Sequence, residues 1–84
     1  MKYRKKPIII DAEPYSEGLE DGFEKMDMSK DSPYHGSITM PYINTLEGRH
    51  YITVNPPDYI VTGVRGERYP VKKDIFEETY EKVD

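Results

Sequence analysis

Basic and aromatic side chains are interleaved in the last third of the chain, and their types suit a ligand pocket. Arginine guanidinium groups bind phosphate through paired hydrogen bonds, and tyrosine rings stack on nucleobases. The sequence therefore predicts a ligand-binding cluster made of Tyr59, Arg65, Arg68, Tyr69, Lys72 and His50. A purely structural interpretation stays open, in which Arg68 and the lysines pair with nearby glutamates and the tyrosines are ordinary strand residues.

Motifs for catalysis are missing from the sequence. The chain has no cysteine and so no thiolate nucleophile, and its four serines lack the glycine context of a nucleophile elbow. The histidines lack zinc-motif spacing, no glycine-rich phosphate loop precedes a helix, and the acids of residues 11–34 lack the spacing of a calcium loop. His35, beside Asp31, is interpreted as a loop histidine rather than a ligand. We expect no enzyme, no metal and no cofactor.

Length and charge limit the classes of protein that the chain can belong to. Eighty-four residues form a single domain, 1–84, with one thin core, and a homo-oligomer is a common way to stabilise so small a scaffold. Residues 1–10 carry a net charge of +4, residues 11–34 carry −6, and the whole chain carries −4. This overall acidity argues against general nucleic-acid binding. No stretch is long and apolar enough for a signal or a membrane span, so we expect a cytoplasmic protein.

The expected elements are strands, followed by one helix. Runs rich in β-branched and aromatic residues predict strands at 6–12, 37–43, 50–54, 59–64 and 67–71. Pro41 indicates an edge, a bulge or a break, and Pro70 indicates an edge. Residues 13–34 are expected to form an acidic, mobile connection. Leu19, Phe23 and Met26 recur there at helical spacing, which indicates either one short helical turn or a solvated connection with a single apolar anchor.

The segment from residue 61 to 81 is expected to be a hairpin followed by a helix. Arg65 and Gly66 suit a two-residue loop with a positive φ at glycine. Asp74 and Glu77 have the spacing of a capping box, and the apolar stripe that follows must pack on the sheet because so short a helix is marginal alone. The predicted fold is α+β, a small antiparallel sheet of four or five strands with a C-terminal helix packed on it.

Three stretches of the sequence together carry a family resemblance. "MKYRKKPIIIDA", "GLEDGF" and "PYINTLEGRHYITVNPPDYIVTGVRGERYPVKKDIFEETYE" resemble a family of small, mostly uncharacterised phage and prophage proteins. Its members typically read K-Y-R-K-K-P, T-L-E-G, P-G-D-Y/W-I, G-V-x-G-E-x-Y-P and K-P-D-I-F-x-x-T-Y-E. The chain departs from this pattern at Pro57, where glycine is usual, and at Lys73, where proline is usual.

The resemblance implies a phage origin and an accessory role inside an infected bacterium, and it assigns no catalytic residues. We therefore expect a phage-encoded, non-catalytic binding protein that acts on host or anti-phage defence machinery. Two alternatives stay open. One is an oligomeric sponge that sequesters a linear or cyclic nucleotide in the basic and aromatic cluster, and the other is a structural or regulatory phage component.

Overall fold

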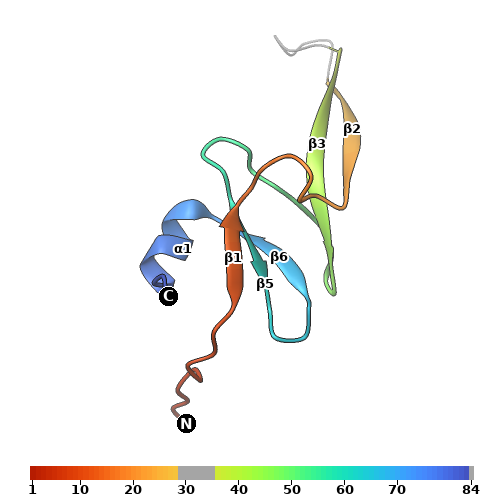
Figure 1. The fold of residues 1–84 in the computed structure, drawn as a ribbon. Helices are drawn as coiled ribbons and strands as arrows, with labels where there is room; N and C mark the ends of the chain where they lie inside the picture. Colours follow the sequence, from red (N-terminus) through yellow and green to blue (C-terminus); the bar gives the residue numbers. More distant parts are fainter. Residues whose placement is uncertain (29–35, 84) are drawn as a thin grey trace.

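The computed structural model describes residues 1–28 and 36–83, which form two small antiparallel sheets and one short helix (Figure 1). One sheet has the order β1-β5-β6 and the other has the order β2-β3-β4. The elements are β1 (Asp11–Pro14), β2 (Gly22–Met28), β3 (Gly36–Thr45), β4 (Gly48–Tyr51), β5 (Tyr59–Thr62), β6 (Arg68–Val71) and α1 (Lys73–Thr79). The mainly antiparallel architecture with a C-terminal helix is confirmed, but the predicted single sheet of four or five strands is not.

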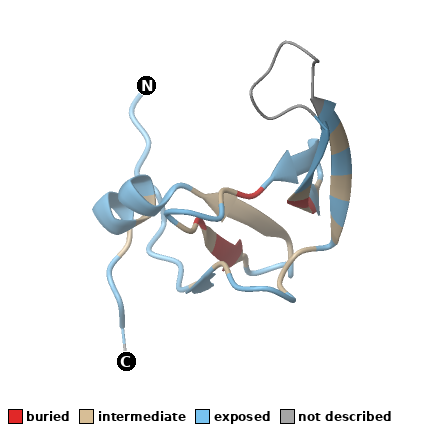
Figure 2. Cartoon of the chain, turned by 90° about the horizontal axis from the view of Figure 1, so that it is seen from above, coloured by how far each residue is buried: buried red, intermediate tan, exposed pale blue. Residues whose placement is uncertain are grey.

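The connection between β4 and β5 separates the two sheets. It contains Pro56 and Pro57, which have no backbone N–H to donate to a ladder, so the chain leaves the β4 edge there. The sheets then pack on each other through Ile60 of β5, Ile43 of β3 and Ile52, which are all at most 3% exposed. Figure 2 shows the buried residues gathered in the middle of the molecule.

The opposite face of the β1-β5-β6 sheet holds α1. Alternate residues of a strand face opposite sides, so Tyr59 and Val61 lie on the face away from Ile60. The Tyr59 ring stacks on Phe76 of α1 with centroids 4.0 Å apart, and Phe76 stacks on Tyr80 at 4.9 Å. These contacts confirm that the C-terminal helix packs on the sheet.

The predicted capping box at the start of this helix is wrong. The helix begins at Lys73, so Asp74 lies inside its first turn rather than at the cap, and its Oδ1 accepts a hydrogen bond from the Ile75 backbone N–H at 2.9 Å. The N-cap residue is Lys72, and it makes no side-chain capping hydrogen bond.

The first predicted strand, 6–12, is misplaced. The strand present is β1, and it pairs with β5 from Asp11↔Thr62 to Pro14↔Tyr59. Earlier residues have no partner on β5, because the next position after Thr62 is Gly63, whose N–H donates to Glu67 across the hairpin loop at 2.8 Å. Residues 1–10 therefore extend beyond the sheet (Figure 1).

The helical turn predicted within residues 13–34 is also wrong. Phe23 and Met26 belong to β2, where they pair with Pro41 and Ile38 of β3. Pairing with β3 along the whole of β2 satisfies the backbone groups that face β3, and this long-range gain overrides the local helical spacing. Residues 29–34 of that predicted connection, and His35, lie outside the described residues.

The proline and glycine positions agree only in part with the predictions made from the sequence. Pro41 lies inside β3, the central strand of its sheet, instead of at an edge, and its carbonyl accepts a hydrogen bond from Ile52 at 2.9 Å. Pro70 lies on the edge strand β6, as predicted. Gly66 has the predicted positive φ, +82°, but the hairpin loop between the bonded residues Gly63 and Glu67 has three residues rather than two.

None of the described helices is long and apolar enough to cross a membrane.

Candidate functional site

The six residues predicted to form one ligand cluster are divided among four places in the structure. His50, Arg68 and Tyr69 line a pocket of about 590 Å³ beside β6. Lys72 lines a different pocket, Tyr59 belongs to the aromatic stack under α1, and Arg65 lies exposed in the β5–β6 loop. The fold therefore does not bring the six side chains together in one pocket.

The pocket beside β6, here called the β6 pocket, contains more acids than bases. Asp21, Glu47 and Glu67 line it together with Arg68. Arg68 Nη1 donates to Asp21 Oδ1 at 3.0 Å, and its Nη2 donates to the Leu19 carbonyl. Two of the five N–H donors of the guanidinium are thus occupied within the chain, and a phosphate group would have to approach the neighbouring carboxylates to reach the others.

Tyr69 and His50, the other two predicted residues that line the β6 pocket, differ in how far they are buried. Tyr69 is half-buried, and burial, together with the neighbouring Tyr80, raises the pKa of its hydroxyl. His50 pairs with Ile43 across the β3–β4 ladder and is exposed. The strand predicted at 50–54 ends at Tyr51 as β4, which leaves His50 near the sheet edge.

Arg65 and Lys72 also make contacts within the chain. The Arg65 backbone N–H donates to Glu67 Oε2 at 3.0 Å, and the Glu67 carboxylate sits over Gly63, where a Cβ would lie 1.8 Å from its Oε1. Lys72 Nζ donates to Thr53 Oγ1 at 2.7 Å. The bond from Lys72 joins the start of α1 to the loop after β4.

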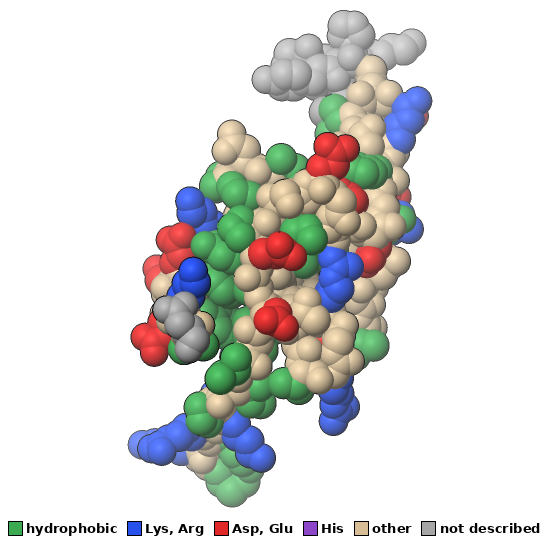
Figure 3. All heavy atoms as spheres, viewed as in Figure 1, with side chains coloured by type: hydrophobic (Ala, Val, Ile, Leu, Met, Phe, Trp, Pro, Cys, Tyr) green, Lys and Arg blue, Asp and Glu red, His purple; other side chains and the backbone are tan. Residues whose placement is uncertain are grey.

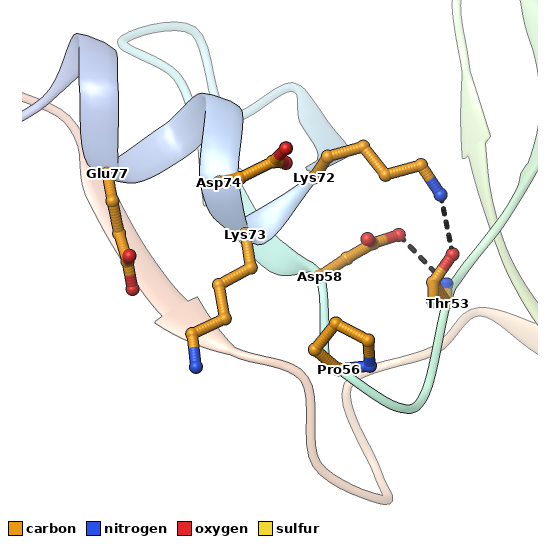
Figure 4. A pocket seen from close by; sticks show the side chains of 7 residues that line it. All are labelled: Thr53, Pro56, Asp58, Lys72, Lys73, Asp74 and Glu77. Carbon is orange, nitrogen blue, oxygen red and sulfur yellow. Dashed lines mark hydrogen bonds between the residues drawn. The ribbon is translucent and has the colours of Figure 1, made fainter.

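A second pocket, which sequence reasoning missed, lies where that loop meets the start of α1. It has a volume of about 580 Å³ and is lined by Thr53, Pro56, Asp58, Lys72, Lys73, Asp74 and Glu77 (Figure 4). We call it the Asp58 pocket. Asp58 lies directly before the buried strand β5 and after two prolines, and this placement of a charged residue was the available signal.

Asp58 is the most unusual residue of the Asp58 pocket. It is only 3% exposed, and its Oδ2 accepts a hydrogen bond from the Thr53 backbone N–H at 2.8 Å. Its own N–H donates back to the Thr53 carbonyl at 2.9 Å, so this residue pair closes the loop. The other carboxylate oxygen, Oδ1, is buried and has no hydrogen-bond partner among the described residues.

A third feature is the N-terminal arm, residues 1–10, which extends from β1 away from the sheets (Figure 1). It carries four basic side chains and no acid, and its apolar side chains face water: Tyr3 is 87% exposed, Ile8 53% and Ile9 76%. Its one contact of note runs from Lys5 Nζ to the face of Tyr80, 5.3 Å from the ring centroid. Figure 3 shows basic and apolar atoms together at this end of the molecule.

Comparison with known proteins adds no relationship to these observations. No protein-family model matches the chain, and searches of curated proteins and of solved structures gave no significant match.

Proposed function

We propose that the chain is a phage-encoded, non-catalytic binding protein that acts on host or anti-phage defence machinery in the cytoplasm of the infected bacterium. The phage setting rests on the sequence resemblance. The observation that carries the binding role is the N-terminal arm, which combines a net charge of +4 with solvent-exposed apolar side chains beside a sheet edge.

The chemistry of the arm favours an acidic protein surface as its partner. Covering apolar area such as that of Ile8 and Ile9 contributes about 25 cal/mol per Å². The basic side chains speed the encounter with an acidic partner and make it dependent on ionic strength. β1 is an edge strand that pairs on one side only, so its other side offers backbone groups to which a partner strand can pair.

The test compares two isoleucines of nearly equal exposure. Ile8 on the arm is 53% exposed and Ile75 on α1 is 51% exposed. Tagged wild type, Ile8→Ser and Ile75→Ser are expressed during infection, and the captured proteins are identified and quantified alongside phage yield on hosts that carry different defence systems. We expect the wild type to capture a specific protein and to raise phage yield. Ile8→Ser should lose both effects, and Ile75→Ser should keep both.

The same comparison can contradict the proposal. If both variants capture the same proteins and support the same phage yield as wild type, the arm is not the binding surface. Raising the salt concentration should weaken capture, because the arm's contribution is electrostatic in part. If capture does not depend on the salt concentration, the basic side chains of the arm do not contribute to partner binding.

Nucleotide sequestration stays the second candidate, and one observation favours it: His50, Arg68 and Tyr69 do line one pocket. The acids around Arg68 count against it. Thermal unfolding with a panel of linear and cyclic nucleotides separates the two candidates, since a ligand at a hundredfold excess over its Kd stabilises by about 2.7 kcal/mol. We expect no shift. The mass in solution, recorded alongside, tests the predicted homo-oligomer.

A further inference from the structure

We propose that the Asp58 pocket is a binding site for an organic cation, with a guanidinium group as the preferred ligand. The inference does not depend on the partner surface proposed above, because the Asp58 pocket is lined by the loop after β4, Asp58 and the start of α1, and by no residue of the N-terminal arm.

The first step is the unsatisfied oxygen of Asp58. A buried carboxylate oxygen without a hydrogen-bond donor destabilises the folded state, and native structures rarely keep one without a reason. Asp58 is 3% exposed and is one of the residues that line the pocket; its Oδ2 accepts the Thr53 N–H, and its Oδ1 is buried and has no hydrogen-bond partner among the described residues. A ligand that donates a hydrogen bond to Oδ1 would supply the missing partner.

The second step concerns the two lysines of the Asp58 pocket, neither of which forms an ion pair with Asp58. Lys72 Nζ bonds to Thr53 Oγ1 at 2.7 Å, and neither lysine is among the partners of Asp58. Figure 4 shows Lys73 extending away from the Asp58 carboxylate. Asp58 therefore has no direct ion-pair partner among the described residues.

The third step is the charge balance of the lining. Three carboxylates, from Asp58, Asp74 and Glu77, outnumber the two ammonium groups. This excess favours a cation over an anion such as phosphate. A volume of about 580 Å³ lies within the range of roughly 300–1,000 Å³ typical of small-molecule sites.

The donor geometry favours an organic cation over a metal ion. No group of three or more His, Cys, Asp or Glu side chains in the described part of the chain could hold a metal ion. A guanidinium is planar, always charged, less strongly hydrated than an ammonium and has five N–H donors, so it can bond to Asp58 Oδ1 and to a rim carboxylate at once.

The binding test uses N-acetylarginine amide as the probe, with N-acetylcitrulline amide as a neutral ligand of nearly the same shape. Amide chemical shifts of the isotope-labelled protein are followed at millimolar ligand concentrations. The Thr53 N–H is the main reporter because it bonds to the carboxylate that would receive the ligand. We expect saturable shifts of Thr53 and Asp58 with the arginine probe and none with the citrulline probe. Equal shifts with both, or none with either, overturn the proposal.

Two glutamates on the same helix give a matched pair of variants. Glu77 lines the Asp58 pocket and its neighbour Glu78 does not, and both are exposed, so neither substitution should unfold the protein. We expect Glu77→Gln to raise the Kd of the arginine probe about threefold, as for an exposed charge pair, and Glu78→Gln to leave it unchanged. Identical Kd values for these two variants overturn the assignment to this pocket.

Asp58→Asn removes the central charge while keeping the shape of the side chain. We expect the Kd to rise about tenfold or more, because a charge-assisted hydrogen bond is lost. Folding of this variant is checked from its amide spectrum, and if it unfolds, the Glu77→Gln comparison decides alone. Wild-type affinity in a folded Asp58→Asn variant contradicts the proposal.

The guanidinium can come from a free small molecule or from an arginine side chain of a protein. Titration with agmatine and with a short arginine-containing peptide separates these sources. Tighter binding of the peptide identifies a protein partner, and equal binding identifies a free cation; both results support the chemistry proposed here. Failure of these titrations would leave the arm experiment untouched, so the two proposals fail separately.

Discussion

Arg68 of β6 donates from Nη1 to Oδ1 of Asp21 at 3.0 Å, and this ion pair links the two sheets. Asp21 in turn accepts a hydrogen bond from the Asn44 backbone N–H through Oδ2 at 2.8 Å, and its own N–H donates to the Tyr42 carbonyl. A residue that the sequence singled out as a phosphate ligand therefore has a structural role between β6 and β3.

The first prediction follows from that role. Replacing Arg68 by Gln should lower the free energy of unfolding by about 1–2 kcal/mol, because the charged hydrogen bonds to Asp21 and to the Leu19 carbonyl are both lost. Arg65→Gln is the control at an exposed loop position, and its effect should stay within about 0.5 kcal/mol. Urea unfolding measures both. Equal losses in the two variants would show that Arg68 has no linking role.

The second prediction concerns the thin core between the sheets. Ile43 is fully buried, whereas Ile38, on the same strand, is 40% exposed. Ile43→Val should cost about 1 kcal/mol through lost contacts and the small cavity that remains, and Ile38→Val should cost clearly less. Thermal and urea unfolding measure the difference. A larger loss at Ile38 would place the core elsewhere.

The third prediction tests the hairpin loop. Gly66 has φ +82°, and a Cβ there would meet no atom within 4 Å, so any penalty comes from the backbone alone. Gly66→Ala should destabilise by about 1 kcal/mol, and Gly66→Asn by less, because asparagine tolerates positive φ better than alanine. Equal unfolding midpoints for the two variants would rule out this conformation in solution.

The fourth prediction is a loss of stability in alkali through Tyr15. Burial, followed by the hydrogen bond to Glu20, raises the pKa of Tyr15 from 10.0 to about 12. The unfolded chain loses this proton at a lower pH than the folded protein. The stabilisation is therefore complete below pH 10 and is lost as the pH rises from about 10 to about 12.

Unfolding temperatures across that pH window measure the effect. Tyr15→Phe, which has no proton to lose, should show a smaller alkaline fall than wild type. Tyr3→Phe, which alters an exposed ring on the arm, is the control and should follow the wild-type profile. Parallel profiles for Tyr15→Phe and wild type would contradict the assignment.

Local features of the fold could be predicted from the sequence because they depend on neighbouring residues. The hairpin between β5 and β6, the glycine at its positive φ and the position of the helix all follow from short-range rules for glycine, proline and apolar spacing. The packing of the helix through Phe76 and Tyr80 follows from the apolar stripe for the same reason.

Pairing between distant residues could not be predicted in this way. Ile8, Ile9 and Ile10 have strong strand propensity, yet no strand lies opposite them, since β5 turns into its loop after Thr62. Phe23 and Met26 have helical spacing, yet they lie in β2, which pairs with β3. Propensity describes one residue, whereas a strand needs a partner.

The same division between local and long-range information applies to the functional groups of the chain. The sequence alone determined which side chains exist: a basic arm, no cysteine, and two arginines between Tyr59 and Tyr69. Only the tertiary structure decided what each side chain contacts. It places Arg68 against Asp21, and it buries Asp58 beside α1 with one carboxylate oxygen that has no hydrogen-bond partner among the described residues. Charged side chains find their partners through space rather than along the chain, and Arg68 and Asp21 are 47 residues apart in the sequence.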